Sequence, residues 1–236
     1  MNHLAPNAGN VGNAQLYSPA AAPAIFDSDS SSKVASKAAS TSTYSPATLS
    51  QPLTDGFARR LTYLRLSITD FCNFRCEYCL PDGYQGKPPQ NELSVTEIAT
   101  LVRGFAQVGT KKVRITGGEP SIRRDVVDII KTIKNTEGIE TVAMTSNGYK
   151  LGKHLASWQA AGLNQLNISM DSFDAATFHK MTGFDMLPQL LADMDTLLAT
   201  TDIKLKINSI LMAETAFENL MNAIDYVKER AVTYRF

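Results

Sequence analysis

Apolar and polar positions follow two alternating periods along most of the chain. From residue 61 to residue 69 the period is two, with Leu64, Leu66 and Ile68 on one face and polar side chains between them. Because successive side chains of a strand point to opposite sides, this pattern predicts a strand. Similar short runs predict five further strands, at 112–116, 140–145, 164–171, 203–210 and 232–236, the last only beginning before the sequence stops.

Between the strands, apolar residues recur at spacings of three and four, which is the period of a helix with one buried face. Ser94 and Glu97 form an S-x-x-E capping box, which predicts the start of the first helix. Gly162 predicts the end of a helix at 151–161. Four apolar stripes predict the remaining helical faces: Ile98, Leu101, Val102, Phe105 and Val108; Val126, Ile129, Ile130 and Ile133; Leu187, Leu190, Leu191, Met194, Leu197 and Leu198; Phe217, Leu220, Met221, Ile224 and Val227.

Alternating strands and helices favour a parallel sheet with helices packed outside it. Buried parallel strands are usually apolar on both faces, but here five strands carry a basic or hydroxyl side chain on the second face. These residues are Arg65, Arg114, Thr145, Ser169 and Lys206. An open doubly wound sheet fits the pattern, as does a solvated antiparallel sheet, although the intervening helices disfavour the latter. We predict an α/β fold in which the strands curl around a wet interior, a partial (β/α)6 TIM-like barrel.

The first stretch, 1–55, differs in composition from the rest. It is rich in Ser, Ala, Asn, Pro and Thr and has almost no apolar periodicity, so it predicts a disordered tail. No arginine precedes Arg59, so secretory and organellar signals fit poorly. The remaining residues, 56–236, are enough for one domain with a sizeable core.

The net charge of the chain bears on the kinds of molecule that it can bind. The chain has 23 basic and 23 acidic side chains, so bulk attraction favours neither nucleic acid nor an anionic membrane surface. No apolar run approaches the length of a membrane span. With three cysteines in one cluster there is no disulfide framework, and a reducing cytoplasm fits.

The three cysteines are the strongest chemical signal. Cys72, Cys76 and Cys79 lie in the segment CNFRCEYC at C-x3-C-x2-C spacing. Thiolates at this density suit zinc or an iron–sulfur cluster. A structural zinc ion needs a fourth ligand from elsewhere, whereas a four-iron cluster on three cysteines leaves one iron open to a small molecule.

The basic residues of the polar face suggest the substrate. Two arginines and one lysine converging on one interior suit a polyanion, because guanidinium groups pair with phosphate oxygens. A salt bridge to a nearby carboxylate is the alternative for each of them. Neither a P-loop nor G-x-G-x-x-G is present to bind a nucleotide in another way. A phosphorylated substrate is therefore expected.

The cysteine segment resembles the signature of the radical S-adenosylmethionine superfamily, with Tyr78 as the aromatic before the last cysteine. The resemblance implies a 4Fe-4S cluster on the three cysteines, whose open iron binds S-adenosylmethionine. It also implies contacts of that cofactor with Tyr78, with Gly118 in the turn RITGGEP and with Ser169 in NISMDS.

A narrower resemblance covers 56–236 and rests on LRLSITDFCNFRCEYCLPDGY, RITGGEP, TSNG and NISMDS together. These motifs are similar to those of the GTP 3′,8-cyclase family. The family's GTP contacts then fall on Arg65, Arg114, Thr145 and Lys206, with Lys112 and Arg235 as further phosphate contacts. The chain departs from the family at Ser146, where a second threonine is expected.

The implied activity is that of a lyase in the first step of molybdenum cofactor biosynthesis. A 5′-deoxyadenosyl radical takes the 3′ hydrogen of GTP, and the product is (8S)-3′,8-cyclo-7,8-dihydroguanosine 5′-triphosphate. Implied partners are GTP, a one-electron donor, a homodimer mate and a downstream molybdenum cofactor synthesis protein. The family's second 4Fe-4S cluster needs C-terminal cysteines that are absent here, so a C-terminally truncated chain is expected.

Two other functions stay open on the residues. One is a radical S-adenosylmethionine enzyme with a different substrate, and the other is a non-catalytic iron–sulfur module. No general acid or base is identified, because His3, His154 and His179 lie outside every motif.

Overall fold

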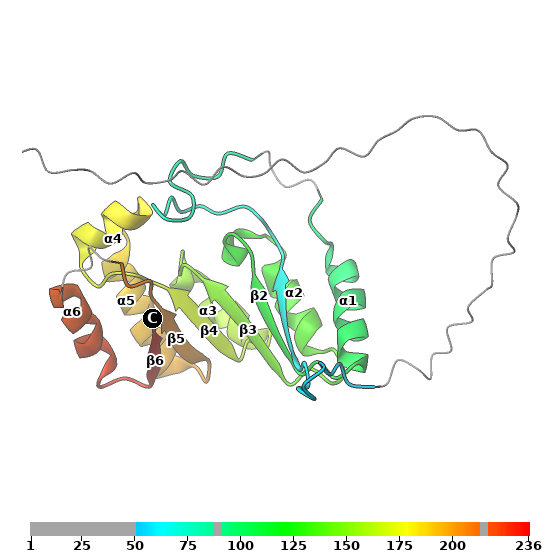
Figure 1. Ribbon diagram of the computed structural model, residues 1–236. Helices are drawn as coiled ribbons and strands as arrows, with labels where there is room; N and C mark the ends of the chain where they lie inside the picture. The colour runs from blue at the N-terminus through cyan, green and yellow to red at the C-terminus, as the bar shows by residue number, and fades with distance from the viewer. Residues whose placement is uncertain (1–50, 87–90, 213–216) are drawn as a thin grey trace, which may run out of the picture. The chain divides into compact units, whose positions relative to one another are not determined.

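The computed structural model describes residues 51–86, 91–212 and 217–236 (Figure 1). The predicted tail therefore lies outside the described residues as far as residue 50. The described strands form one sheet in sequence order, and every neighbouring pair is parallel. The strands are β1 (Tyr63–Ser67), β2 (Lys112–Thr116), β3 (Thr141–Ser146), β4 (Gln165–Ser169), β5 (Lys204–Asn208) and β6 (Val232–Arg235).

Helices connect the strands, so the predicted alternation is confirmed. They are α1 (Val95–Gln107), α2 (Val126–Lys134), α3 (Leu151–Ala160), α4 (Ala175–Thr182), α5 (Leu187–Thr200) and α6 (Phe217–Val227), with a 3-10 turn, η2, at Pro120–Ile122. The capping box at Ser94 is present, because Ser94 Oγ accepts from Glu97 N and Glu97 Oε2 accepts from Ser94 N. Gly162, with a φ of 94°, follows α3 as predicted.

The sequence analysis missed α4. This helix has eight residues and only two large buried apolar side chains, Phe178 and Met181, too few for a recognisable stripe. Its ends are nevertheless marked in the sequence: Asp174 accepts a hydrogen bond from Thr177 N, and Gly183 ends the helix with a φ of 77°.

The predicted first strand was too long. Ile68 is buried and its amide still bonds to Thr116 O, so the apolar alternation continues past the last residue of β1. The chain then leaves the sheet and enters the cysteine loop. Alternation alone could not mark this point, because burial in the core does not require pairing in a strand.

One face of the sheet is apolar and carries the core. Ile115, Met144, Ile168 and Ile207 are fully buried there, against helices that lie behind the sheet in Figure 1. Trp158, Ile130, Leu190 and Met194 supply the helical side of the core. None of the described helices is both long and apolar enough to cross a membrane.

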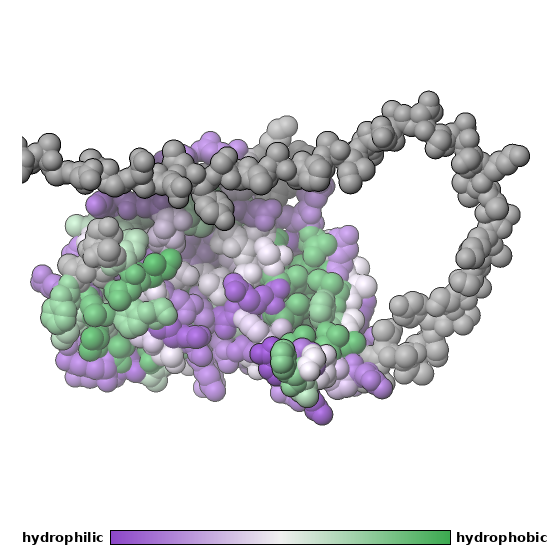
Figure 2. Space-filling model, viewed as in Figure 1, coloured by the Kyte–Doolittle hydropathy of each residue, from purple (hydrophilic) through white to green (hydrophobic). Residues whose placement is uncertain are grey.

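The other face is polar, as predicted. The register places Arg65 opposite Arg114, and Asn167 opposite both Thr145 and Lys206. Figure 2 views this face, with hydrophilic side chains over the strands and hydrophobic ones over α1 and α6. In the described part of the chain β1 pairs only with β2 and β6 only with β5, so the sheet is open, as a partial barrel requires.

Candidate active site

A cleft of about 340 Å³ lies where the strands end at their carboxyl side. This is the edge at which open parallel sheets bind ligands. The cleft is lined by residues from the ends of β1 to β5 and from the loop after β1. Of the predicted site residues, those that line it are Arg65, Cys72, Cys76, Tyr78, Cys79, Gly118, Thr145 and Ser169. Arg114 and Lys206 lie on the same face of the sheet but outside the lining.

The cysteine loop is folded by local turns and docked on α4. The amides of Cys79 and Leu80 both donate to Cys76 O at 2.9 Å, which closes the loop around the last two cysteines. Arg75 N donates to Thr182 O at 3.0 Å and Glu77 N to Met181 O at 3.2 Å. The helix α4, which was not predicted from the sequence, therefore supports the cysteine loop.

An aromatic cluster anchors the same loop in the core. Phe74 is 3 % exposed and lies between two cysteines in the sequence. Its ring stacks on Phe184 with centroids 4.7 Å apart and meets Phe178 of α4 edge-on at 6.3 Å. Phe74 thus anchors the loop in the core, and it lines the cleft together with the three cysteines.

All three cysteines are free thiols. Burial raises the pKa of Cys76 to about 11, and the carboxylate of Asp171 adds to the effect. Burial also raises the pKa of Cys72. Both thiols are therefore protonated at neutral pH until a positive group displaces the proton, as a bound metal does.

Tyr78 connects the loop to the far side of the cleft. Its hydroxyl donates to Asp171 Oδ2 at 2.6 Å, and Asp171 Oδ1 accepts from Ile210 N at 2.7 Å. Burial and the hydrogen bond to this carboxylate raise the pKa of Tyr78. Asp171, which the sequence analysis did not select, thus joins the cysteine loop to the segments after β4 and β5.

The two glycines after β2 pack against the cysteine loop. A Cβ atom at Gly118 would lie 2.3 Å from Phe71 O, and one at Gly117 would lie 2.4 Å from Thr69 O. The amide of Gly118 donates to Thr69 O at 2.8 Å. The glycines therefore permit a close approach of backbone to backbone.

Glu119 links this turn to the end of β3. It is 1 % exposed; Oε1 accepts from Ser121 N and from Ser146 Oγ, and Oε2 accepts from Asn147 N at 2.6 Å. Burial raises the pKa of Glu119, and the hydrogen bonds from Asn147 and Ser121 oppose that rise. Ser146 keeps the hydroxyl that a threonine would supply, so the departure from the family motif preserves this contact.

Two basic residues of the polar face, Arg114 and Lys112, have neutral hydrogen-bond partners. Arg114 is 8 % exposed and donates to Tyr63 OH at 2.6 Å and to Thr145 Oγ1 at 3.3 Å. Lys112 donates to Gln165 Oε1 at 2.6 Å. Burial lowers the pKa of Lys112, as do the charges of Arg114 and Lys206.

No salt bridge within residues 51–86, 91–212 and 217–236 involves Arg65, Lys112, Arg114 or Lys206. The alternative that each basic residue pairs with a carboxylate therefore finds no support in the described residues. An uncompensated group of cations on one face suits an anionic ligand.

Whether a cluster fits beside Cys72 can be tested on Asn73. Its Oδ1 accepts from Asn147 Nδ2 at 3.0 Å, and Asn147 Oδ1 in turn accepts from Tyr149 N at 2.9 Å. This chain of bonds fixes the orientation of the Asn73 amide and leaves its Nδ2 buried without an acceptor. An added group that carries acceptor atoms, such as the sulfur atoms of a cluster, fits this place.

A single metal ion finds less support. Among the described residues, no three His, Cys, Asp or Glu side chains are gathered closely enough to hold one. A closed zinc site, the alternative for the cysteine segment, is thus not preformed there.

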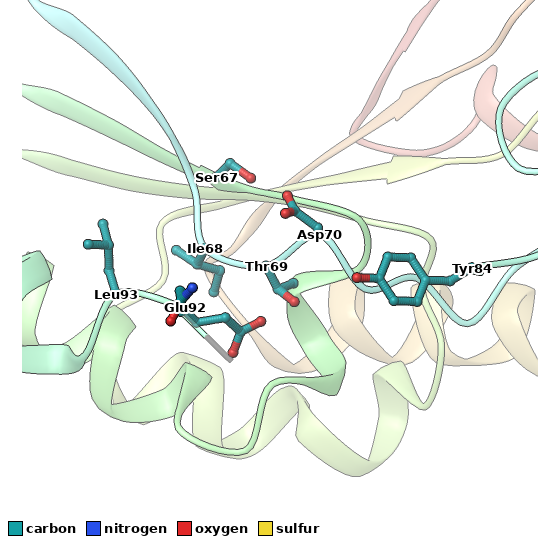
Figure 3. A pocket seen from close by; sticks show the side chains of 8 residues that line it. Ser67, Ile68, Thr69, Asp70, Tyr84, Glu92 and Leu93 are labelled. Atoms are coloured by element: carbon teal, nitrogen blue, oxygen red, sulfur yellow. The ribbon is translucent and has the colours of Figure 1, made fainter. Parts of the chain in front are cut away.

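A second cavity, of about 320 Å³, lies where the chain leaves β1 (Figure 3). Residues 67–70 form one wall, Glu92 and Leu93 before α1 form another, and Tyr84 closes one end. Arg123, whose side chain is 7 % exposed, holds the walls together by donating to Ile68 O and Leu93 O at 2.6 Å each. No cysteine lines this cavity, which separates it from the candidate site.

A family model described as the radical SAM superfamily matches residues 66–233. The GTP 3′,8-cyclase of Pectobacterium atrosepticum is 50 % identical over 186 residues, which cover 78 % of this chain and 56 % of that protein. The chain therefore spans little more than half the length of this curated relative.

Solved structures share the fold. Streptococcus suis SuiB bound to S-adenosylmethionine has a TM-score of 0.64 at 16 % identity, covering 79 % of this chain and 40 % of that one. HydG, a maturase of the [FeFe]-hydrogenase, has a TM-score of 0.57 at 17 % identity, covering 70 % and 38 %. At these identities the likeness concerns the fold alone.

Proposed function

The chain belongs to the radical SAM superfamily, and from that premise we propose that it forms the cluster-binding and triphosphate-binding part of a GTP 3′,8-cyclase. The observation that carries the proposal is one cleft lined by the three cysteines, the glycine turn and Ser169, above a sheet face with uncompensated cations. The proposed reaction converts GTP to (8S)-3′,8-cyclo-7,8-dihydroguanosine 5′-triphosphate, in the first step of molybdenum cofactor biosynthesis.

We propose Cys72, Cys76 and Cys79 as ligands of a 4Fe-4S cluster. When bound, the cluster supplies the electron that cleaves S-adenosylmethionine, and the resulting radical takes a hydrogen atom from the substrate. The Asn73 amide has a donor ready for a sulfur atom at this place. The loop itself is held on α4 and by Phe74, which keeps the three thiols on one wall of the cleft.

We propose that Gly118, Ser169 and Tyr78 position S-adenosylmethionine. The amide of Gly118 is already bonded to Thr69 O, so the contact with the cofactor's ammonium group falls to the Gly118 carbonyl oxygen. Ser169 offers a hydroxyl at the end of β4, within the cleft. The Tyr78 hydroxyl is held by Asp171, so Tyr78 closes the cleft and limits the entry of water.

We propose Arg65, Arg114 and Lys206 as ligands of the triphosphate, with Lys112 and Arg235 as further contacts. Guanidinium and ammonium donors on one face match the charge of three linked phosphates. Thr145 and Tyr63 hold the Arg114 side chain between them, which sets the direction of its remaining donors.

Partners and location follow from the same assignment. We propose GTP and a one-electron donor as partners, and a homodimer and a downstream molybdenum cofactor synthesis protein as assemblies. A cytoplasmic location suits three free thiols. The sequence has no cysteine outside the loop, so a second 4Fe-4S cluster would take its ligands from cysteines that this sequence does not contain.

The test uses the chain reconstituted anaerobically with iron and sulfide. S-adenosylmethionine and dithionite are added, and 5′-deoxyadenosine and cyclised nucleotide are measured with and without GTP. Deoxyadenosine that rises with GTP supports the proposal. Deoxyadenosine that GTP leaves unchanged favours a radical enzyme with another substrate. A cluster-loaded chain that does not bind S-adenosylmethionine favours a non-catalytic module.

Arg114→Lys gives the residue-level version of this test. We expect GTP affinity to fall about tenfold, because lysine cannot replace a guanidinium held by two partners, whereas guanosine affinity changes little. Arg103→Lys on the exposed surface of α1 is the matched control and leaves both affinities unchanged. Equal losses for GTP and guanosine would argue against a phosphate contact at Arg114.

A further inference from the structure

Asn167, in the middle of the polar face, has a buried side-chain carbonyl oxygen, Oδ1, without a hydrogen-bond partner among the described residues. It lies in β4 and is 4 % exposed. A buried amide carbonyl that has lost water without gaining a donor costs free energy. Such an atom in a native structure requires an explanation, and an incoming ligand is one.

The neighbours of Asn167 are predicted substrate residues. The parallel register places it between Thr145 of β3 and Lys206 of β5. Side chains directly opposite on adjacent strands lie about 5 Å apart. Neither neighbour donates to Asn167 Oδ1, although both lie on the same face of the sheet.

The register also gives the depth of Asn167 in the site. Residues two apart on one face of a strand are separated by about 6.6 Å. Arg114 lies opposite Ala143, one such step before Thr145, and Ser169 lies one step after Asn167. Asn167 therefore occupies the level between the arginines and Ser169.

Each level, meaning a row of residues at the same depth along neighbouring strands, is assigned a part of the bound molecules by the proposed function. The arginine level holds the outer phosphates, and the Ser169 level holds S-adenosylmethionine. Lys206, which lies opposite Asn167, holds the phosphate next to the sugar, so the ribose borders the level of Asn167. An ionised triphosphate offers only acceptors, so it cannot satisfy the carbonyl oxygen of Asn167 in the amide orientation of this structure. A ribose hydroxyl is a hydrogen-bond donor and can satisfy this carbonyl oxygen.

We propose that Asn167 Oδ1 accepts a hydrogen bond from a ribose hydroxyl of the nucleotide substrate. Asn167 is thus a positioning residue that orients the sugar below the cofactor and selects ribonucleotides over deoxyribonucleotides. A site built around a buried acceptor rejects an analogue that lacks the donor, because the acceptor is then left unpaired. This inference rests on the proposed function, which supplies the nucleotide.

The experiment measures binding of GTP, 2′-deoxy-GTP and 3′-deoxy-GTP to the cluster-loaded chain by calorimetry, without reductant so that no turnover occurs. We expect the wild-type chain to bind one of the two deoxynucleotides about tenfold more weakly than GTP. In Asn167→Leu, which removes the acceptor at similar volume, that difference disappears because GTP affinity falls to the level of the deoxynucleotide.

Two further variants separate selection from mere folding. Asn167→Asp keeps an acceptor, so we expect it to keep the preference for the hydroxyl while binding all triphosphates more weakly through charge repulsion. Arg114→Lys weakens all three nucleotides by the same factor and leaves their ratio unchanged. If Asn167→Leu loads no cluster, the ratio in Asn167→Asp decides.

Failure of the proposed function and failure of the role of Asn167 give different results. A wild-type chain that binds no GTP overturns the proposed function. A chain that binds GTP with the same ribose to deoxyribose ratio in wild type and Asn167→Leu overturns the role of Asn167 alone. A uniform loss for all three nucleotides in Asn167→Leu also overturns it, because it indicates a purely structural effect.

Discussion

At the level of single residues, Glu119 is the best connected side chain around the cleft. Its two oxygens accept three hydrogen bonds, from Ser121, Ser146 and Asn147, while the carboxylate is almost inaccessible to water. The partners come from two different segments, 27 and 28 positions away on the β3 side. Glu119 therefore fixes the glycine turn relative to the end of β3.

Glu119→Gln tests this role. Glutamine can keep the two bonds at one oxygen, but its amide group then meets the Asn147 amide, donor against donor. We expect the free energy of unfolding to fall by about 1–3 kcal/mol in urea titration. The control, Glu137→Gln, changes an exposed carboxylate and shifts the same quantity by less than about 0.5 kcal/mol. Equal losses in both variants would remove the special role of Glu119.

His154 gives a prediction about pH. Burial and the charges of Lys153 and Lys150 lower its pKa from the ordinary value of 6.5, and its ring stacks on Trp158 with centroids 5.5 Å apart. Because the unfolded chain then binds the proton more readily, His154 destabilises the fold as pH falls from 6.5 through its lowered pKa.

NMR titration should therefore show a His154 midpoint below 6.5. Wild type should also lose stability relative to His154→Gln between neutral pH and pH 5, as measured by urea titration at several pH values. A midpoint at or above 6.5 contradicts the prediction.

Where a motif is local, the sequence selected residues that the fold brings together at one cleft, and their roles stay predictions. The cysteine spacing, the glycine turn and the alternation of β1 were enough to select residues that line one cleft. Asp171 and Asn167 were not selected, because the residues that lie near them in space are far away in the sequence. The Tyr78–Asp171 bond spans 93 positions, and no local pattern encodes it.

At the level of elements, α4 is the main correction. Five helices were predicted, four of them from stripes of apolar residues, whereas α4 is short and depends on its caps and on two buried side chains. Two of its backbone carbonyl groups, those of Met181 and Thr182, nevertheless accept hydrogen bonds from the backbone of the cysteine loop. An element with a weak sequence signal can thus support a functional loop, since its own stability comes from tertiary packing.

Asp174→Ala removes the cap of α4 and tests this support. Asp174 Oδ1 accepts from Thr177 N at 2.8 Å and from Thr177 Oγ1 at 2.7 Å, so its loss costs about 1 kcal/mol of stability. We expect Cys76 in the native chain to be alkylated faster, because local opening of α4 releases the loop.

Ser94→Ala is the matched control for this experiment. It removes the cap of α1 at a similar cost in global stability, but α1 makes none of the described backbone bonds to the cysteine loop. Cys76 reactivity should stay at the wild-type level after correction for stability. Equal acceleration in both variants would show that only global stability matters.

At the level of the whole molecule, acidic and basic residues are equal in number, but they are unevenly distributed over the fold. The sequence has equal numbers of acidic and basic residues, yet Lys112, Arg114 and Lys206 lie close enough to lower the pKa of Lys112. Net charge therefore said nothing about the polar face. The alternation predicted that these cations share one face, and the register of the sheet brings them together there.

Salt gives the corresponding test. The Debye length is about 10 Å at 0.1 M salt and shortens as salt rises, which weakens attraction between the cations and a triphosphate. We expect GTP affinity to fall several-fold between about 0.05 and 0.5 M salt, while guanosine affinity stays nearly constant. Calorimetry measures both. A GTP affinity that is indifferent to salt contradicts a site based on these cations.

The strand order has a consequence for how the molecule is made. Each described strand pairs with the one before it, so the long-range contacts join consecutive strand–helix units and close only loops of moderate length. A chain emerging from the ribosome can therefore add one unit at a time to the edge already formed. The cysteine loop, which leaves β1 and docks on α4, must wait until three further strands have been synthesised. The three thiols therefore reach their final positions only after four of the six described strands have been synthesised.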